Sequence, residues 1–92
     1  SEQRFRVATR LPLDELGELF GLELDDDDVD SVGGLLAKEL GRLPEVGDKV
    51  TVSGLIIEAD RSGSHRKRVT RAIVEPDQDL IDARHAFTEE EN

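Results

Sequence analysis

The sequence predicts a small α+β domain in which two helices cover one face of a small, mostly antiparallel sheet. Three observations predict this fold class. Short stretches of alternating apolar and polar residues are typical of half-buried strands, two intervening stretches carry their apolar residues on one helical face, and 92 residues suit one small domain. The predicted order of elements is β-α-α-β-β, followed by a C-terminal tail that either forms a helix or stays disordered.

The first strand is predicted over residues 5–11, where Phe5 and Val7 alternate with arginines. This alternation predicts one buried face and a basic outer face. Pro12 ends the strand, because proline cannot donate a hydrogen bond to a neighbouring strand.

The first helix is predicted directly after this proline. Asp14 can cap its start, and its inner face is formed by Leu16, Leu19 and Phe20. Gly21 suits the position after the helix, where a left-handed conformation is common. An acidic loop over residues 22–30 follows.

The second helix is predicted over residues 32–40, because three leucines share one face: Leu35, Leu36 and Leu40. Either Asp30 or Ser31 caps its start. Gly41 fits the left-handed position after its end.

One long strand is predicted over residues 49–60. Its apolar residues change phase between Val52 and Leu55. A strand that keeps one face buried cannot change phase without an extra residue, so we place a bulge or bend at Gly54.

A hairpin turn is predicted over residues 61–64, and a returning strand over residues 65–75. Pro76 stops that strand. The tail carries apolar residues that suit one side of a helix: Leu80, Ile81, Ala83 and Phe87. We therefore divide the chain into a domain over residues 1–76 and a tail over residues 77–92.

The composition limits the classes of function. A total of 22 acidic against 12 basic side chains gives a formal net charge of −10, and such a surface repels nucleic acid and anionic lipid. The absence of cysteine excludes disulfides and cysteine-based metal sites. Apolar runs of at most three residues exclude a membrane span or a signal-peptide core in this sequence. Because the chain opens with Ser1 and contains no methionine, we expect a processed product or a piece of a longer protein.

Five aspartates are the candidate metal ligands: Asp25, Asp26, Asp27, Asp28 and Asp30. Aligned from the fourth of them, the segment approaches the calcium-binding EF-hand pattern, but Val32 offers no side-chain oxygen at the fifth position. A looser carboxylate cluster for magnesium or calcium is the second interpretation. The third is a solvated acidic loop whose charge favours the start of the following helix. We adopt the third, because adjacent side chains point apart along the chain.

The other candidates give no catalytic site. Gly33 and Gly34 either cradle a phosphate or allow close packing, and we favour packing because the nearby aspartates repel an anion. His65 and His85 are isolated and have no partners at a spacing that suggests a triad. The basic segment RSGSHRKR could contact RNA or lipid headgroups, but it has no interleaved aromatic residue. We expect it to pair instead with an acidic surface of its own domain, of a second copy or of a neighbouring domain. The sequence therefore predicts no enzyme activity.

The run DSVGGLLAKELGRLPEVGDKV resembles the signature segment of the CorC/HlyC transporter-associated domain. That pattern has a Thr or Ser, a Gly-Gly pair, an amphipathic helix, and then Gly-x-x-Pro-x-x-Gly-Asp before a strand. The matching residues are Ser31, Gly33, Gly34, Gly41, Pro44, Gly47 and Asp48. The resemblance extends from Phe5 to Pro76. It departs from the pattern in the serine, which replaces a commoner threonine, and in the unusually Asp-rich loop.

The resemblance implies a context that the residues alone do not give. Such domains usually end larger membrane proteins, after a transmembrane domain and a pair of nucleotide-sensing CBS domains, on the cytoplasmic side of the membrane. These haemolysin-like proteins are associated with magnesium and cobalt efflux. The implied function is that of a non-catalytic regulatory domain that contacts the CBS and transmembrane domains, inserts nothing into the membrane itself, and is open to homodimer formation.

A second hypothesis is a small-ligand-binding domain. The family fold is similar to part of a PCMH-type FAD-binding domain, which raises FAD or another nucleotide as a ligand. Fold similarity does not carry function, and we assign no residue to a flavin. We therefore expect no cofactor, and a survey of ligands by thermal shift distinguishes the two hypotheses.

Overall fold

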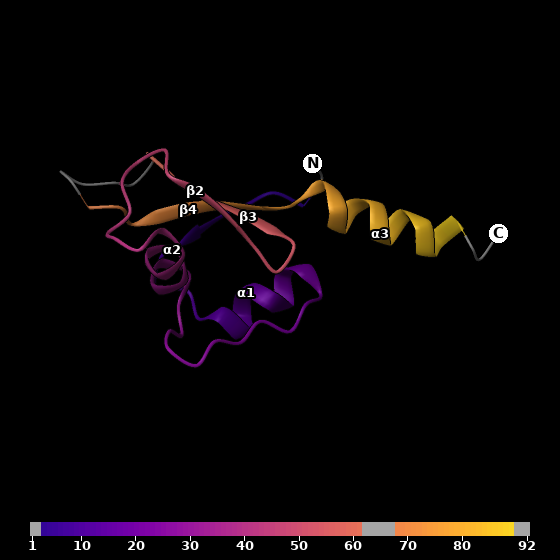
Figure 1. The fold of residues 1–92 in the computed structure, drawn as a ribbon, viewed down its shortest axis with the longest axis horizontal. Coiled ribbons are helices and arrows are strands. Elements are labelled where there is room, and N and C mark those ends of the chain that lie inside the picture. Colours follow the sequence, from indigo (N-terminus) through magenta and orange to yellow (C-terminus); the bar gives the residue numbers. More distant parts are fainter. Residues whose placement is uncertain (1–2, 62–67, 90–92) are drawn as a thin grey trace.

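The computed structural model describes residues 3–61 and 68–89. Along this part of the chain the elements follow in the order β-α-α-β-β-β-α (Figure 1). They are β1 (Phe5–Ala8), α1 (Leu13–Phe20), α2 (Val32–Leu40), β2 (Lys49–Val52), β3 (Leu55–Ala59), β4 (Arg71–Pro76) and α3 (Gln78–Glu89).

The strands form one antiparallel sheet in the order β1-β4-β3-β2. α1 and α2 lie on the same side of this sheet, and α3 projects away from it (Figure 1). The predicted fold class, a small α+β domain with two helices over one face of an antiparallel sheet, is confirmed. The predicted order of elements lacked a strand that the described residues contain.

The additional strand arises because residues 49–60 form a hairpin and not one long strand with a bulge. A two-residue turn at Ser53 and Gly54 joins β2 to β3, and φ is positive at both residues, 54° and 82°. Type I′ turns, which are common in two-residue hairpins, have this property. Val52 consequently pairs with Leu55, which puts the two side chains on the same face. The change of phase in the sequence is the mark of this turn.

β1 and β4 also differ in extent from the predicted strands. β1 ends at Ala8, earlier than predicted, because the N–H of Leu11 donates to the carbonyl of Ala8 at 3.0 Å and closes a turn. β4 begins at Arg71, and Pro76 is its last residue, paired with Leu55, instead of the first residue beyond it. Most of the predicted turn over residues 61–64 lies outside the described residues.

The core lies between the helices and the inner face of the sheet. Phe5 of β1 meets Phe20 of α1 edge to face, with 5.3 Å between the ring centroids. The largest fully buried side chains are Phe20, Leu16, Leu36, Leu55, Ile57, Val32 and Val74. Burial of each such side chain contributes about 1.5–3 kcal/mol, which makes this cluster the main source of stability.

α1 differs from the prediction at its start and on its inner face. Pro12 precedes the helix and gives no side-chain cap, whereas Asp14 lies inside the first turn. Leu19 was predicted to face the core but is 40% exposed. Because the helix begins at Leu13, the buried stripe follows the spacing i, i+3, i+4, i+7 instead: Leu13, Leu16, Gly17 and Phe20.

The tail forms a helix, the first of the two alternatives. Leu80 of α3 packs against the core while remaining partly exposed. Arg84 donates hydrogen bonds to the side chain of Gln3 and to the carbonyl of Phe20. These contacts hold the first turns of α3 on the domain, and the rest of the helix extends outward (Figure 1).

Candidate functional site

The helix–strand loop, residues 41–48, connects α2 to β2. Gly41 ends α2 with φ of 75°, and its N–H donates to the carbonyl of Ala37 at 2.8 Å. Gly47 has φ of 95° near the other end of the loop. Side chains disfavour this region of φ, so the two glycines of the sequence pattern occur where the backbone needs them.

Arg42 and Asp48 close the helix–strand loop with a two-pronged ion pair. Nη1 and Nη2 of Arg42 donate to Oδ2 and Oδ1 of Asp48 at 2.8 and 2.9 Å, and the backbone N–H of Glu45 donates to the same carboxylate at 2.8 Å. The Arg42 hydrogen bonds, and then that of Glu45, hold the pKa of Asp48 below its ordinary value. Asp48 in turn raises the pKa of Arg42. This planar geometry fixes the two ends of the loop relative to each other.

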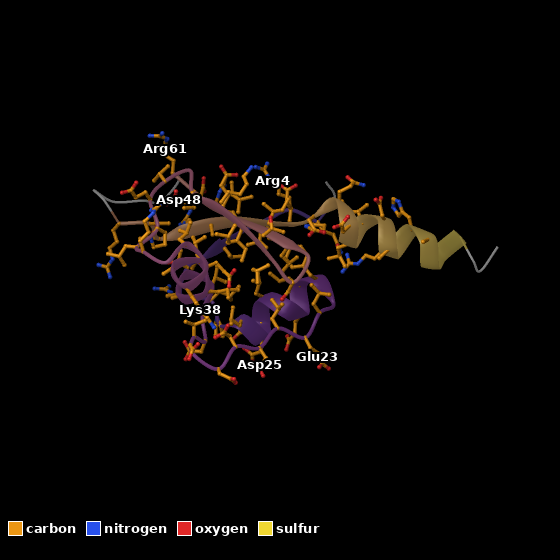
Figure 2. All side chains as sticks on the ribbon, in the orientation of Figure 1. Arg4, Glu23, Asp25, Lys38, Asp48 and Arg61 are labelled. Carbon is orange, nitrogen blue, oxygen red and sulfur yellow. The ribbon has the colours of Figure 1, made fainter. Side chains whose placement is uncertain are left out.

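Backbone hydrogen bonds attach the same loop to β3. The N–H of Gly47 donates to the carbonyl of Ala59 at 2.9 Å, and the N–H of Ala59 donates to the carbonyl of Asp48 at 2.8 Å. The loop is therefore held on the sheet, toward the end of the molecule remote from α3 (Figure 2). Its apolar side chains nevertheless face solvent, since Leu43 is 83% exposed and Val46 is 41% exposed.

The start of α2 is capped by Ser31, whose Oγ accepts a hydrogen bond from the N–H of Gly34 at 3.1 Å. The N–H of Gly33 donates to the carbonyl of Thr9 at 2.7 Å. A Cβ on Gly33 would lie 3.0 Å from the Cβ of Thr9, and one on Gly34 would lie 3.1 Å from the Cβ of Val29. Close approach of α2 to the neighbouring segments thus gives a reason for this glycine pair.

Asp26 organises the acidic loop, residues 22–30. Its Oδ1 accepts hydrogen bonds from the backbone N–H groups of Asp28 and Val29 at 2.8 and 3.2 Å. Lys38 of α2 donates to both carboxylate oxygens of Asp26 at 3.0 and 2.9 Å and lies 3.0 Å from the carboxylate of Asp28. The hydrogen bonds from Lys38, and then from the Asp28 N–H, lower the pKa of Asp26. The two carboxylates, Asp26 first, raise the pKa of Lys38.

The five candidate metal ligands do not converge on one point. Asp26 is half-buried, and the other four are exposed: Asp25, Asp27, Asp28 and Asp30. A cation between Asp26 and Asp28 would have to displace the ammonium of Lys38. Among residues 3–61 and 68–89, no three Asp, Glu or His side chains are grouped so that they could hold a metal ion. Residues 32–39 belong to α2, so the segment does not form an EF-hand loop.

An open groove of about 470 Å³ lies between the acidic loop and the start of α1. The guanidinium of Arg10 is its basic group, and its carboxylates come from Asp14, Asp25, Asp26 and Asp30. In the described part of the chain no charged side chain is buried, whereas catalytic acids and bases commonly depend on burial to shift their pKa. The groove presents negative charge without a desolvated acid–base pair.

The histidines and the basic segment contribute little to the described surface. His85 is exposed on α3, and His65 and most of the basic segment lie outside the described residues. Arg4 and Arg61 lie on the opposite side of the molecule from Glu23 and Asp25 (Figure 2). These two arginines therefore lie on a different side of the molecule from this part of the acidic loop (Figure 2).

Sequence reasoning missed the two basic residues that fix both loops, Arg42 and Lys38. The spacing of Arg42 and Asp48 across a Pro-and-Gly turn is a usable signal for the first pair. No local signal marks the pair of Lys38 with Asp26, because the partners come from a helix and from the loop before it.

The sequence of this chain is similar to those of known proteins. Residues 1–78 match the CorC_HlyC family, described as a transporter associated domain. A UPF0053 protein of Mycobacterium tuberculosis is 55% identical over 69 residues, which cover 74% of this chain and 16% of that protein. The magnesium and cobalt efflux protein CorC of Vibrio cholerae is 28% identical over 81 residues, which cover 88% of this chain and 28% of that protein. The chain thus spans less than a third of the length of these relatives.

Solved structures share the fold. The Mg²⁺ and Co²⁺ transporter (CorC) associated region of Neisseria meningitidis gives a TM-score of 0.70 at 29% identity, covering 83% of this chain and 91% of that one. A hemolysin domain of Enterococcus faecalis gives a TM-score of 0.68 at 26% identity, and the match covers 85% of this chain and 93% of that one. Neither is described as a flavin-binding domain, so the expected likeness to part of a FAD-binding domain is not confirmed. None of the helices described for this chain is long and apolar enough to cross a bilayer.

Proposed function

The chain belongs to the CorC_HlyC family of transporter associated domains, and we propose on this basis that it is a non-catalytic regulatory module of a divalent-cation transporter. It acts through contacts with other domains of the same polypeptide, on the cytoplasmic face of the membrane. Magnesium and cobalt are the proposed ions, because relatives from several bacteria are magnesium and cobalt efflux proteins.

The observation that carries this proposal is the size of the match. Residues 1–78 fit a transporter associated domain, yet the chain spans only 16% and 28% of two longer relatives. No helix described in this segment is long and apolar enough to cross a membrane. Its contribution to such a protein is therefore exerted on the other domains.

The geometry of the described residues also favours a role in contacts with other domains over a role in catalysis. The groove beside the acidic loop is open, and no charged side chain in the described residues is buried. The Arg42–Asp48 pair and the Lys38–Asp26 pair, in each of which both carboxylate oxygens accept hydrogen bonds, hold loops in place. The proposed partners are the CBS and transmembrane domains that the family resemblance implies.

Transport by the full-length protein in proteoliposomes tests this proposal. Efflux of Mg²⁺ is compared between the intact protein and a version that lacks residues 1–78. We expect transport to persist, with its rate or its half-saturating Mg²⁺ concentration changed about 5-fold or more, the range of ordinary coupling between sites. Identical transport with and without the domain would overturn the regulatory role. Complete loss, in a protein that remains folded, would show that the domain belongs to the transport machinery itself.

A ligand survey tests the remaining alternative, binding of FAD or another nucleotide, which no described residue favours. A ligand at a hundredfold excess over its dissociation constant stabilises the folded state by about 2.7 kcal/mol. We expect FAD to leave the melting temperature unchanged, and a dose-dependent rise would reinstate the ligand-binding function.

A further inference from the structure

The helix–strand loop exposes apolar side chains that do not contribute to the core. Leu43 is 83% exposed and Val46 is 41% exposed. The other large apolar side chain with comparable exposure among the described residues is Leu19, at 40%, on α1. Single exposed apolar residues are ordinary on protein surfaces. Here two of them flank Pro44 on one short loop, and we call these three residues, Leu43, Pro44 and Val46, the apolar knob.

The backbone under the apolar knob is fixed before any partner binds. Arg42 donates to the carbonyl of Leu43 at 3.1 Å as well as to Asp48. The backbone groups of Glu45 and Asp48 are also joined, with the N–H of Asp48 donating to the carbonyl of Glu45 at 2.9 Å. A loop that is ordered in advance loses little conformational entropy on binding, so its side chains can contribute most of their burial to affinity.

We propose that the apolar knob inserts into an apolar pocket on another domain of the same polypeptide. The inference rests on the proposed function and names the surface through which it is exerted. The side chains of the knob form the centre of the proposed interface. A few well-buried side chains usually contribute most of the binding energy of an interface.

The charge around the knob favours an uncharged partner surface. Residues 41–49 contain two basic and two acidic side chains, Arg42, Lys49, Glu45 and Asp48. Their formal charges cancel, on a chain with a formal net charge of −10. A partner can approach this end of the domain without the repulsion that the acidic loop imposes. A phosphate-rich surface gains little from residues 41–49 themselves, because their formal charges sum to zero.

The small size of the knob favours a tethered partner over a second copy. Stable interfaces typically use about 20–30 residues on each side, far more than the knob and its loop provide. Full burial of a leucine improves affinity by about 10- to 100-fold, which is too little to hold two separate chains together. A tether supplies an effective concentration in the millimolar range, at which such a contact forms.

Site-directed photocrosslinking in the full-length protein tests the inference. A benzophenone amino acid replaces Leu43, and in matched controls it replaces Leu19 of α1 or Thr51 of β2. Thr51 is exposed and lies on the face of the sheet opposite the helices. After irradiation, crosslinked peptides are identified by mass spectrometry. We expect the probe at position 43 to crosslink, within one polypeptide, to an apolar segment outside residues 1–92, with a yield about 10-fold above either control.

The outcomes separate this inference from the proposed function. Crosslinks from position 19 or 51 to the rest of the polypeptide, without an excess from position 43, would overturn the knob and leave the proposed function standing. Crosslinks from position 43 to a second copy of the chain would replace the tethered partner with a dimer. No crosslink from any of the three positions would count against both the knob and the proposed contacts.

Discussion

Replacing Gly17 with alanine tests how closely the acidic loop packs on α1. Gly17 lies inside the helix, where exchanging glycine for alanine ordinarily stabilises a protein by about 1 kcal/mol. In this fold the added Cβ would lie 2.4 Å from the carbonyl oxygen of Leu22 and 3.3 Å from the backbone nitrogen of Leu24. Steric repulsion from the loop backbone therefore opposes the gain in helix propensity.

The repulsion is expected to exceed the gain. A carbon and a carbonyl oxygen rarely approach closer than about 3.3 Å, so the loop must move by about 1 Å. The N–H of Leu22 donates to the carbonyl of Gly17 at 2.9 Å, and this hydrogen bond resists the movement. Overpacking costs about 1–3 kcal/mol, and a weakened backbone hydrogen bond costs about 0.5–1.5 kcal/mol. After subtraction of the propensity gain, we expect the free energy of unfolding to fall by about 2 kcal/mol.

Urea denaturation followed by circular dichroism measures this change. With a slope of about 1–2 kcal/mol per molar urea, the midpoint falls by about 1–2 M. Glu18→Ala is the matched control, because Glu18 is the exposed neighbour on the same helix, and its expected effect is below about 0.5 kcal/mol. A midpoint for Gly17→Ala equal to or above that of the unsubstituted chain would refute the packing of the loop on α1.

Three further predictions concern the loops. Gly41→Val is expected to lower the free energy of unfolding by more than about 1 kcal/mol, because φ is 75° at this position; an unchanged urea midpoint would contradict the role of this glycine. The pKa values of Asp26 and Asp48 lie below their ordinary value of 3.8, so both groups stabilise the folded state above about pH 4, and this contribution is lost as the pH falls through the folded-state values. Urea midpoints measured from about pH 7 down to about pH 2 should fall at the acid end, and a midpoint that rises there would reverse the assigned sign. Isothermal calorimetry with Ca²⁺ and with Mg²⁺ at near-physiological salt should show no saturable one-to-one binding tighter than about 100 μM; tighter binding that disappears in an Asp28→Ala, Asp30→Ala variant would identify the acidic loop as an ion sensor.

Features set by local backbone rules could be predicted from the sequence. The bounds of α2 follow from its leucine spacing, and Ser31 and Gly41 lie at its two ends as caps. Each of these residues acts on backbone groups within four positions along the chain, so the relevant interactions are visible in a short window.

The hairpin between β2 and β3 shows where such rules become ambiguous. A change of phase in an apolar pattern fits a bulge within one strand and a tight turn between two. Ser53 has φ of 54°, a conformation that serine seldom adopts and that asparagine, aspartate or glycine would have signalled. The turn was therefore missed, and with it one strand of the sheet.

Side-chain pairing was the least predictable feature. With 22 acidic and 12 basic residues, every arginine and lysine has many candidate partners, and the fold decides among them. Arg42 meets Asp48 because the loop between α2 and β2 turns back on itself, and Lys38 meets Asp26 because α2 runs beside the acidic loop. The exposure of Leu43 is also decided by the fold. Its apolar character alone would place it in the core.

Nuclear magnetic resonance gives the most direct test of whether the domain acts through contact with the rest of the polypeptide. Backbone amide shifts of the isotope-labelled domain are recorded while the proposed partner, an unlabelled CBS-domain fragment of the same polypeptide, is added up to millimolar concentration. Contact through the apolar knob predicts shifts in residues 41–48 that grow with partner concentration, with an affinity on the order of millimolar because tethering is absent, and no shifts in the acidic loop. The absence of any shift in the domain at that concentration would contradict the central claim.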